Sequence, residues 1–339
     1  DGDLVSVTLD RTVTCMEQAT GRMRWRMRLP PDSAGWGASA GLLIARDKLF
    51  VPCPNGRPDG KMVCVDMKDG KIAWMAPLGG VGIWDRPSPV FAAGRVVYGH
   101  VVGKKSLVQA WDVASGTPAW EVELKITPPG AASGCSDGTN VFFTAGRELW
   151  GWKAEGDGAR GETVAVDAAT GKIVWRSTEL FATCTPALFG GDKLFMIEFG
   201  DGPKCGVRAV STRDGSLVWR GGKARASRIS IGPDYAVLRG YGGGGDKLKL
   251  QDGTGYPGIK PGGQLGGDTH ACGAVALSPA YAFASTVGGL DVRDVKTGDL
   301  AWRSPGFAPR GCVNAILSNG RIFWPTAASG MIYCWEPMN

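Results

Sequence analysis

Among the residues of this chain that could carry redox, metal or acid–base chemistry are nine cysteines and two histidines. A thiolate can act as a nucleophile or metal ligand, and an imidazole can transfer protons near neutral pH. His270 lies two residues before Cys272, and Cys184 and Cys312 occupy matching positions ahead of similar turns. The chain has no Cys-x-x-Cys pair, so the spacing typical of a zinc site is missing. These residues define a candidate site whose chemistry their spacing leaves open.

Three arginines could add positive charge to the same place. Arg86, Arg228 and Arg310 each stand where an apolar, strand-like segment begins. If these segments line a common channel, the guanidinium groups would attract an anion at its mouth. Ordinary loop arginines are the alternative, and for the cysteines the alternatives are small-residue packing, a disulfide or a metal pair. The complete set, called the channel-mouth residues below, is Arg86, Cys184, Arg228, His270, Cys272, Arg310 and Cys312.

A recurring hairpin pattern must position any such site. In the stretch VDAATGKIVW (166–175), apolar and polar residues alternate on both sides of AATG, which predicts two antiparallel strands and a tight turn. Gly171 suits a turn position with positive φ, and Asp167 can accept the backbone N–H groups of the turn. Six copies carry the same glycine and tryptophan, and four carry the aspartate: Gly21, Trp25, Asp66, Gly70, Trp74, Asp112, Gly116, Trp120, Asp167, Gly171, Trp175, Gly215, Trp219, Asp294, Gly298 and Trp302.

The tryptophan of each copy requires a neighbouring unit. An indole buries on the order of 200 Å², more than the face of one hairpin can cover, so we expect each hairpin to stack on the next. Successive motif glycines are 44 to 55 residues apart except for a final gap of 83. That gap predicts a degenerate unit near 227–266 that lacks the motif. Apolar hairpins at 89–99, 186–198, 274–285 and 315–325 are expected to supply the inner strands.

The repeated pattern small-x-Asp-x-x-Thr-Gly-x-x-x-Trp resembles the repeat of the pyrroloquinoline-quinone-like (PQQ-like) β-propeller superfamily, and the resemblance covers nearly the whole chain. It implies an all-β fold, with residues 1–339 forming a single propeller of four-stranded antiparallel blades. Eight blades are expected, the first lacking its inner strand and the last its outer strand, with pairing of the terminal segments closing the ring. Seven blades are the alternative. A glycine-rich insertion is expected at about 241–268 and an exposed loop at 153–162.

Some cysteines are expected to serve only as small buried hydrophobes. Cys15 and Cys64 stand six residues before a motif glycine, where other copies have alanine, and Cys334 fits the same position. Cys53 is expected to face Cys64 across a hairpin, so a disulfide there would need only suitable geometry.

The superfamily includes quinoprotein alcohol dehydrogenases and non-enzymatic scaffolds such as the outer-membrane-barrel assembly lipoprotein. The chain has neither the vicinal cysteine pair nor the acidic calcium site of the enzymes, so the resemblance transfers no catalytic residue and implies no cofactor or metal. We therefore expect a non-catalytic scaffold that binds other protein subunits. The alternatives are a redox enzyme with PQQ and Ca²⁺ at the channel mouth, and a small-ligand or carbohydrate binder using Trp36 and Trp84.

The charge and hydropathy of the chain limit the classes of partner that we expect. The net charge is +6, from 38 basic and 32 acidic residues, and the basic residues are scattered without a run of five. This pattern indicates an ordinary solvated surface, so no nucleic-acid partner is expected. No apolar run approaches 18 residues, so no membrane span is expected either. Because members of the superfamily are usually exported, the resemblance implies a periplasmic or other extracytoplasmic location.

Overall fold

In the computed structural model of the protein, every regular element described is a β-strand. The chain divides into two compact units, the first made of residues 1–192 with 212–215 and the second of residues 193–211 with 216–339. The structure describes residues 2–8, 10–31, 41–53, 60–79, 88–126, 132–145, 161–178, 188–198, 206–222, 226–240, 245–256, 275–286, 289–304, 315–325 and 332–335.

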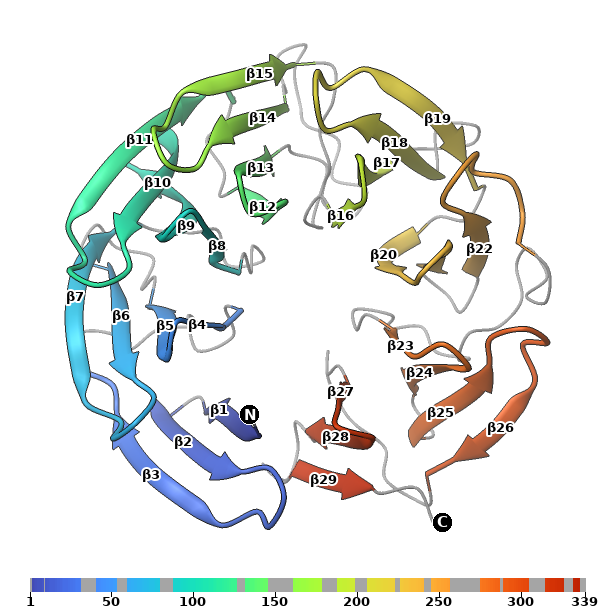
Figure 1. Ribbon diagram of the computed structural model, residues 1–339, viewed down its shortest axis with the longest axis horizontal. Coiled ribbons are helices and arrows are strands. Elements are labelled where there is room, and N and C mark those ends of the chain that lie inside the picture. Colours follow the sequence, from blue (N-terminus) through green and yellow to red (C-terminus); the bar gives the residue numbers. More distant parts are fainter. Residues whose placement is uncertain are drawn as a thin grey trace. The chain divides into compact units, whose positions relative to one another are not determined.

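The first unit contains four antiparallel sheets and a further strand in its described part (Figure 1). The strands of the four sheets are, in order, β1 (Asp3–Val7), β2 (Thr12–Glu17) and β3 (Met23–Arg28); β4 (Leu43–Ala45), β5 (Lys48–Cys53), β6 (Gly60–Asp66) and β7 (Ile72–Leu78); β8 (Val90–Ala92), β9 (Arg95–Val102), β10 (Lys105–Asp112) and β11 (Pro118–Leu124); β12 (Ser133–Ser136), β13 (Asn140–Ala145), β14 (Glu162–Asp167) and β15 (Ile173–Ser177). The further strand is β16 (Leu188–Gly190).

The second unit also contains four antiparallel sheets in its described part. Their strands are β17 (Lys193–Glu198), β18 (Gly206–Ser211) and β19 (Leu217–Gly221); β20 (Ala226–Ile231), β21 (Tyr235–Gly240) and β22 (Gly245–Lys249); β23 (Ala276–Leu277), β24 (Tyr281–Thr286), β25 (Gly289–Asp294) and β26 (Leu300–Arg303); β27 (Ile316–Ser318), β28 (Arg321–Pro325) and β29 (Ile332–Trp335). The all-β class and the antiparallel hairpins predicted from the sequence are therefore confirmed.

Among the three-stranded sheets, the first (β1–β2–β3) and the last (β27–β28–β29) lack a strand for the reason given by the repeat. In a full sheet the motif hairpin forms the third and outer strands, as β6 and β7 do. In the β1–β2–β3 sheet the motif hairpin is β2–β3, so the missing strand is the inner one. In the β27–β28–β29 sheet the described strands are the first three, so the missing one is the outer strand. Both observations agree with the sequence prediction.

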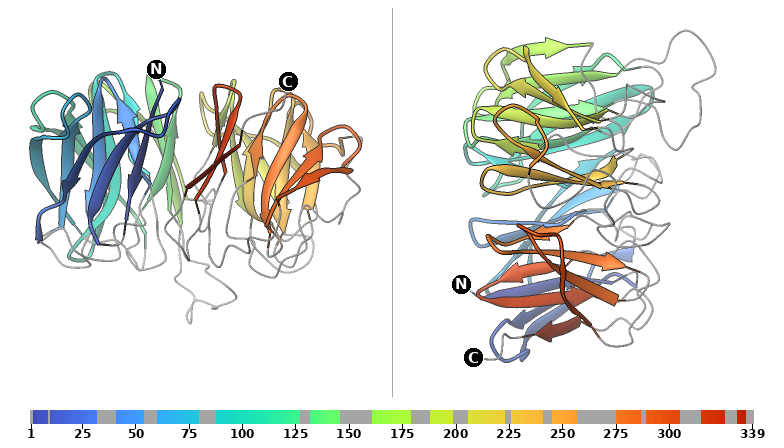
Figure 2. Two further views of the ribbon diagram at one scale, coloured as in Figure 1. Left: turned by 90° about the horizontal axis from the view of Figure 1, so that it is seen from below. Right: turned by 90° about the vertical axis from the view of Figure 1, so that its right-hand side faces the viewer.

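Within each unit the hydrophobic core lies between consecutive sheets, which stand side by side with their strands aligned (Figures 1 and 2). One buried cluster joins Val13, Cys15 and Trp25 of the first sheet to side chains of β5 and β6. Two further clusters join the second sheet to the third and the third to the fourth. In the second unit, Tyr235 and Val237 pack against the sheet β23–β26, which in turn packs against Trp324 of β28.

The strand register corrects the expected pairing of Cys53 with Cys64. Cys53 lies opposite Lys61, and Cys64 lies opposite Phe50. The two cysteines are thus three register positions apart, and because side chains alternate between the faces of a strand, they point to opposite sides of the sheet. Cys53 belongs to the core on one side and Cys64 to the core on the other. No disulfide joins them.

The structure also changes the picture of the glycine-rich stretch expected at about 241–268. Residues 245–249 form β22, and the following turn ends at Gly253. The rest of that stretch, apart from 250–256, lies outside the described residues, as do residues 153–160 of the other expected loop.

Candidate interaction surface

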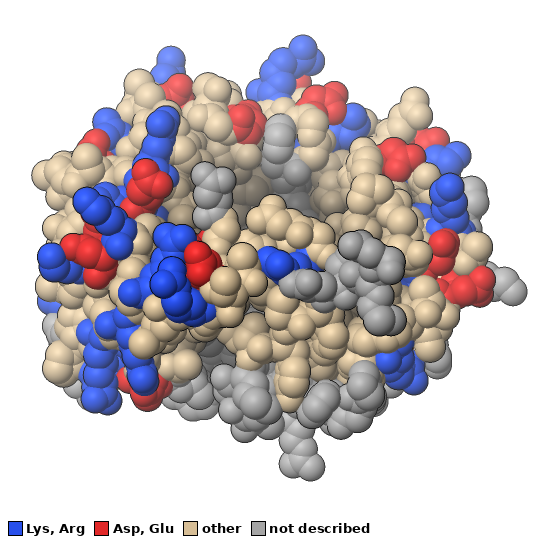
Figure 3. Space-filling model, turned by 60° about the horizontal axis from the view of Figure 1, so that its bottom comes forward, with Lys and Arg blue, Asp and Glu red and all other residues tan. Residues whose placement is uncertain are grey.

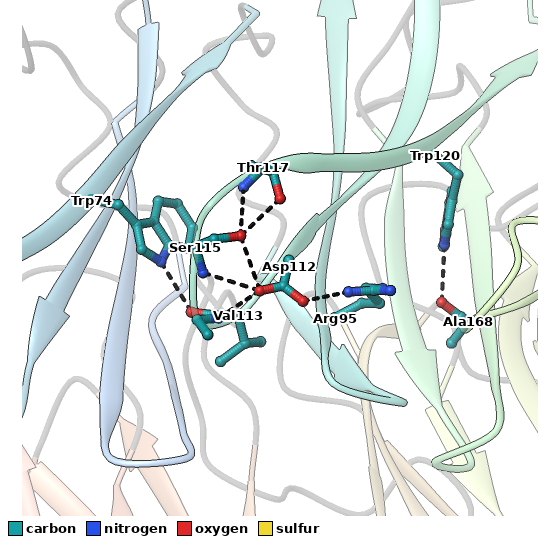
Figure 4. Close-up of polar contacts among 9 residues, drawn as sticks. Trp74, Arg95, Asp112, Val113, Ser115, Thr117, Trp120 and Ala168 are labelled. Atoms are coloured by element: carbon teal, nitrogen blue, oxygen red, sulfur yellow. Dashed lines mark hydrogen bonds and ion pairs between the residues drawn. The ribbon is translucent and has the colours of Figure 1, made fainter.

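The aspartate of each motif holds its turn closed, as the sequence predicted. Asp112 is the clearest example, since its Oδ1 accepts the backbone N–H groups of Ala114 and Ser115, both at 3.0 Å (Figure 4). The other carboxylate oxygen contacts Arg95 of β9 at 2.5 Å. These hydrogen bonds, above all that from Ser115, lower the pKa of Asp112. Turn hydrogen bonds likewise lower the pKa values of Asp167 and Asp294, whereas the pKa of Asp66 is lowered first by the hydrogen bond from Lys48 and then by that from the N–H of Lys68 in its turn. Each of these carboxylates therefore has a structural role, because it stabilises the turn that contains it.

The motif glycines are required for two reasons. All six have φ between +70° and +78°, a region that L side chains rarely adopt. In addition, a Cβ on Gly116 would lie 2.5 Å from Cδ2 of Trp74, which belongs to the preceding sheet. The turn therefore forms a flat platform for the indole of its neighbour.

Each platform also accepts a hydrogen bond from the indole that rests on it. Trp74 Nε1 donates to the carbonyl of Val113 at 3.0 Å, and Trp120 Nε1 donates to that of Ala168 at 2.9 Å (Figure 4). In every case the acceptor directly follows the position of the motif aspartate. The other three pairs of this kind are Trp25 with Met67, Trp175 with Thr212, and Trp219 with Leu250. The predicted stacking of each tryptophan on the next unit is confirmed for these five.

Trp302 departs from this pattern. Its side chain is 39% exposed, whereas Trp25, Trp74 and Trp219 are at most 9% exposed. Its ring contacts Trp335 of β29 at 5.7 Å between centroids. The expected burial of this tryptophan is therefore wrong, and the reason is the shortened last sheet, in which no motif turn is described to cover the indole.

A small residue lies directly opposite five of the six motif tryptophans, and Val292 lies opposite Trp302. Cys64 pairs with Trp74 and Cys15 with Trp25, where other sheets have an alanine. Both cysteines are fully buried, and burial raises the pKa of Cys15 to about 11 and that of Cys64 to about 12. Their thiols stay protonated at neutral pH, so the predicted role as small hydrophobes is confirmed. Cys334 is exposed instead, because no described strand covers β29.

The degenerate unit contains a turn of the motif type, although its sequence lacks the motif. Gly253 has φ +72°, its N–H donates to the carbonyl of Lys249, and Trp219 rests on it. The turn was overlooked because Lys249 replaces the aspartate and no tryptophan follows four residues after the glycine.

Lys247 takes over the role of the missing tryptophan. It occupies the small-residue position of the sheet and is 2% exposed. Its Nζ donates to the carbonyl of Val295 at 2.6 Å, the acceptor that a motif indole would use in the neighbouring turn. The rings of Tyr235 and Tyr256 lie 4.3 and 3.9 Å from Nζ, at cation–π distance. Burial lowers the pKa of Lys247, and the carbonyl and the two rings stabilise its charge.

His100 is structural. It is 2% exposed on β9, its Nδ1 accepts the N–H of Gly79 at 2.7 Å, and its ring lies against Trp111. Desolvation, opposed by hydrogen bonding with Gln109, lowers its pKa to about 4. The imidazole is therefore neutral at physiological pH and serves as an acceptor for the loop after β7.

Two fully buried carboxylates are neutralised by arginines of the neighbouring outer strand. Glu162 of β14 lies 3.1 Å from Arg176 of β15. Asp291 of β25 accepts two hydrogen bonds from Arg303 of β26, at 2.6 and 2.8 Å. Both pairs fasten an outer strand to its sheet. The described residues bring together no group of three or more His, Cys, Asp or Glu side chains that could hold a metal ion.

The channel-mouth residues cannot be placed from the structure. Of the seven, only Arg228 belongs to the described residues, as part of β20, and nothing is described of its side chain. Trp36 and Trp84 also lie outside the described residues. The expectation that these residues form a ligand site stays a prediction.

An exposed apolar row is the repeated surface feature that the sequence analysis did not single out. The second residue after a motif glycine is apolar and 37–56% exposed in five outer strands. This set, called the apolar rim row, consists of Met23, Ile72, Ile173, Leu217 and Leu300. Val174 and Val218 extend it at the next position. The signal was present in the repeats, as an apolar residue at the start of each outer strand.

Antiparallel sheets that stack through a tryptophan, with a glycine turn of one sheet receiving the indole of another, define a repeat protein of the β-propeller class. A model of the family described as outer membrane protein assembly factor BamB matches residues 9–143 and 104–338. The chain belongs to this family. The described residues contain no helix with the length and apolarity that crossing a membrane requires.

Individual relatives agree with this assignment. The chain is 26% identical over 254 residues to outer membrane protein assembly factor BamB of Burkholderia pseudomallei (strain K96243), covering 72% of this chain and 60% of that protein. The chain thus spans less than two thirds of that relative's length. Among solved structures it is similar to BamB from Moraxella catarrhalis, with a TM-score of 0.66 and 13% identity over 99% of this chain and 91% of that chain. A europium-containing methanol dehydrogenase has the same TM-score at 12% identity, over 96% of this chain and 80% of that chain. At these identities the structural likeness shows the fold alone.

Proposed function

We propose that this chain is a non-catalytic scaffold, located in an extracytoplasmic compartment, that binds other protein subunits of an outer-membrane protein assembly complex. The observation that carries the proposal is the apolar rim row, found on a chain of the BamB family. Single exposed apolar side chains are ordinary, but their recurrence at one position of successive sheets within each unit offers a partner protein several apolar contact points. No residue described in the structure favours the alternative of quinone-dependent redox activity.

The full architecture that we propose is an eight-bladed propeller whose ring is closed by pairing of the N- and C-terminal segments. Two observations support this architecture. Each unit has four described sheets, and the first sheet lacks an inner strand while the last sheet lacks an outer strand. Small-angle X-ray scattering tests this proposal. A closed propeller of this length has a radius of gyration of about 20 Å, and a clearly larger value would contradict closure.

The function is tested in a strain from which the gene has been deleted. We expect the levels of outer-membrane proteins to fall and to recover when the wild-type gene is returned. The variant Ile173→Glu with Val174→Glu should fold, because both side chains are substantially exposed, but should not restore those levels. Lys172→Glu, an exposed change on the same hairpin, is the matched control and should restore them. Unchanged outer-membrane protein levels after deletion, together with dye-linked dehydrogenase turnover by the purified protein with PQQ and Ca²⁺, would support the redox alternative instead.

A further inference from the structure

The outer strand β3 has three exposed arginines, Arg24, Arg26 and Arg28. Arg26 and Arg28 are two residues apart and share a face, while Trp25 enters the core and Arg24 lies at a register shift between β2 and β3. Arg26 and Arg28 are called the arginine face below. Figure 3 shows Lys and Arg side chains crowded together in the region of β2 and β3. A concentration of like charge on a strand of six residues calls for a physical explanation.

Among the described residues, Arg26 and Arg28 form no ion pair, whereas charged residues on other outer strands do. On β11, Glu123 pairs with Lys105 of β10 at 2.7 Å, and on β26, Arg303 pairs with Asp291. Opposite Arg26 and Arg28, β2 presents Thr14 and Thr12. Arg24 contacts Asp3 at 3.0 Å, but among the described residues no ion pair involves Arg26 or Arg28. Their charge is available to an external anion.

A hollow of about 350 Å³ lies beside the two arginines. It is lined by Asp10, Thr12, Arg26, Met27 and Arg28. Asp10 is the one acidic group in this lining, and its carboxylate already accepts hydrogen bonds from Thr8 and Thr12, which lower its pKa to about 2. Asp10 therefore offsets part of the positive charge, and the lining retains one net positive charge.

The backbone of the arginine face also points outward. β3 is the last strand in the order β1–β2–β3, so among the described strands one of its edges is open. The N–H of Leu29 donates to the carbonyl of Arg11 across the sheet. Because hydrogen-bonded and non-bonded positions alternate in an antiparallel pair, Met27 and Trp25 also bond towards β2. The N–H and C=O groups of Arg26 and Arg28 then point to the open edge.

We propose that β3 binds an acidic extended segment of a partner protein, which adds to the sheet as a further strand. Asp or Glu at alternate positions of that segment would lie opposite the arginines, where cross-strand carboxylate–guanidinium pairs form, while the edge supplies backbone hydrogen bonds. The arginines also explain selectivity, since charged side chains on an edge discourage pairing with neutral strands. This surface is distinct from the apolar rim row, except that Met23 begins the same strand, and the inference does not depend on the role in outer-membrane protein assembly.

The test uses the purified full chain and three seven-residue peptides with blocked ends. The first peptide alternates Glu and Val, the second replaces each Glu by Gln, and the third has the first sequence with every backbone amide N-methylated, so that it cannot complete a ladder. Isothermal titration calorimetry should show the first peptide binding at least tenfold more tightly than either of the others. Hydrogen exchange should slow at the amides of Arg26 and Arg28 when the first peptide is bound.

Two double variants of β3 and one control variant elsewhere make the result specific to β3. Arg26→Glu with Arg28→Glu should weaken binding of the first peptide at least tenfold, and Arg26→Gln with Arg28→Gln should also weaken it without reversing the charge. Lys68→Glu with Lys172→Glu makes the same change in net charge at exposed positions elsewhere and should leave binding unchanged. Equal losses in the β3 and control variants, or binding without slower exchange at β3, would overturn the proposal. Binding of anionic lipid vesicles but not of the peptide would assign the arginine face to a membrane surface instead.

Discussion

The burial of His100 makes stability depend on pH in a way that can be calculated. The pKa of this imidazole is about 4 in the folded protein, whereas an unfolded chain has an ordinary value of about 6.5. Between these values the unfolded state binds the additional proton, so the free energy of unfolding falls as the pH falls. From pH 7 to pH 5, the two pKa values predict a loss of about 2 kcal/mol from this residue alone.

The variant His100→Asn isolates this contribution. Asparagine keeps a side-chain acceptor for the N–H of Gly79 but cannot be protonated in this range. Urea denaturation of both proteins at pH 7, 6 and 5 should show that the difference in unfolding free energy between them changes by about 2 kcal/mol across the series. The carboxylates with lowered pKa values contribute to both proteins and cancel in this comparison.

A direct measurement accompanies the stability series. The chain has two histidines, so the NMR signals of His100 can be assigned by comparison with His270→Asn. We expect the His100 imidazole to remain neutral down to about pH 4. Titration of His100 near pH 6.5, or a parallel pH dependence of wild type and His100→Asn, would refute the reasoning.

Two further predictions concern the stacking of the sheets. Gly94 and Gly116 have φ of +73° and +71°, but a Cβ at Gly94 meets nothing within 4 Å while one at Gly116 would strike Trp74. Changing either glycine to Ala should lower the free energy of unfolding by about 1–2 kcal/mol through backbone strain alone. Gly116→Ala should lower it by at least about 1 kcal/mol more, because the indole contact and its hydrogen bond are lost. Urea denaturation measures both changes, and equal losses for the two variants would show that the platform contact does not contribute to stability. Lys247→Met keeps the buried apolar stem but leaves the carbonyl of Val295 without its hydrogen-bond donor, so it should destabilise the protein by about 1–3 kcal/mol. An increase in stability would indicate that burial of the ammonium group costs more free energy than its contacts contribute.

Much of the fold could be predicted because the repeat encodes it locally. The hairpin around Gly171, the turn-closing role of Asp167 and the small residue Ala165 opposite Trp175 all depend on residues within about ten positions of one another. The repeat pattern does not predict the contacts of Lys247. The motif tryptophan is absent from this unit, and the ammonium group of Lys247 donates the hydrogen bond to the neighbouring turn instead. The pattern also fails at Cys334, which matches the small-residue position but lies on a strand that no described neighbour covers.

Less of the candidate surface could be predicted. The channel-mouth residues were chosen from spacing, and their arrangement lies outside the described residues. The apolar rim row is visible in the repeats, but an apolar residue beside a buried tryptophan is ordinarily assigned to the core, and only the exposed fractions correct this. Alternation in MRWRMR predicts that Arg26 and Arg28 share a face of the strand. The sequence does not show that Thr12 and Thr14, rather than acidic residues, lie opposite these two arginines.

The sequence by itself determined the repeating hairpin, the all-β class and the need for each indole to rest on another unit, because turn geometry and strand alternation follow from neighbouring residues. The tertiary structure alone decided which side chains complete those contacts and which remain exposed. Trp74 and its acceptor Val113 are 39 residues apart, and Lys247 and Val295 are 48 apart. The burial of a side chain, the shift of its pKa and the pairing of its charge depend on residues that are distant in the sequence. The stacking of the sheets determines which residues these are.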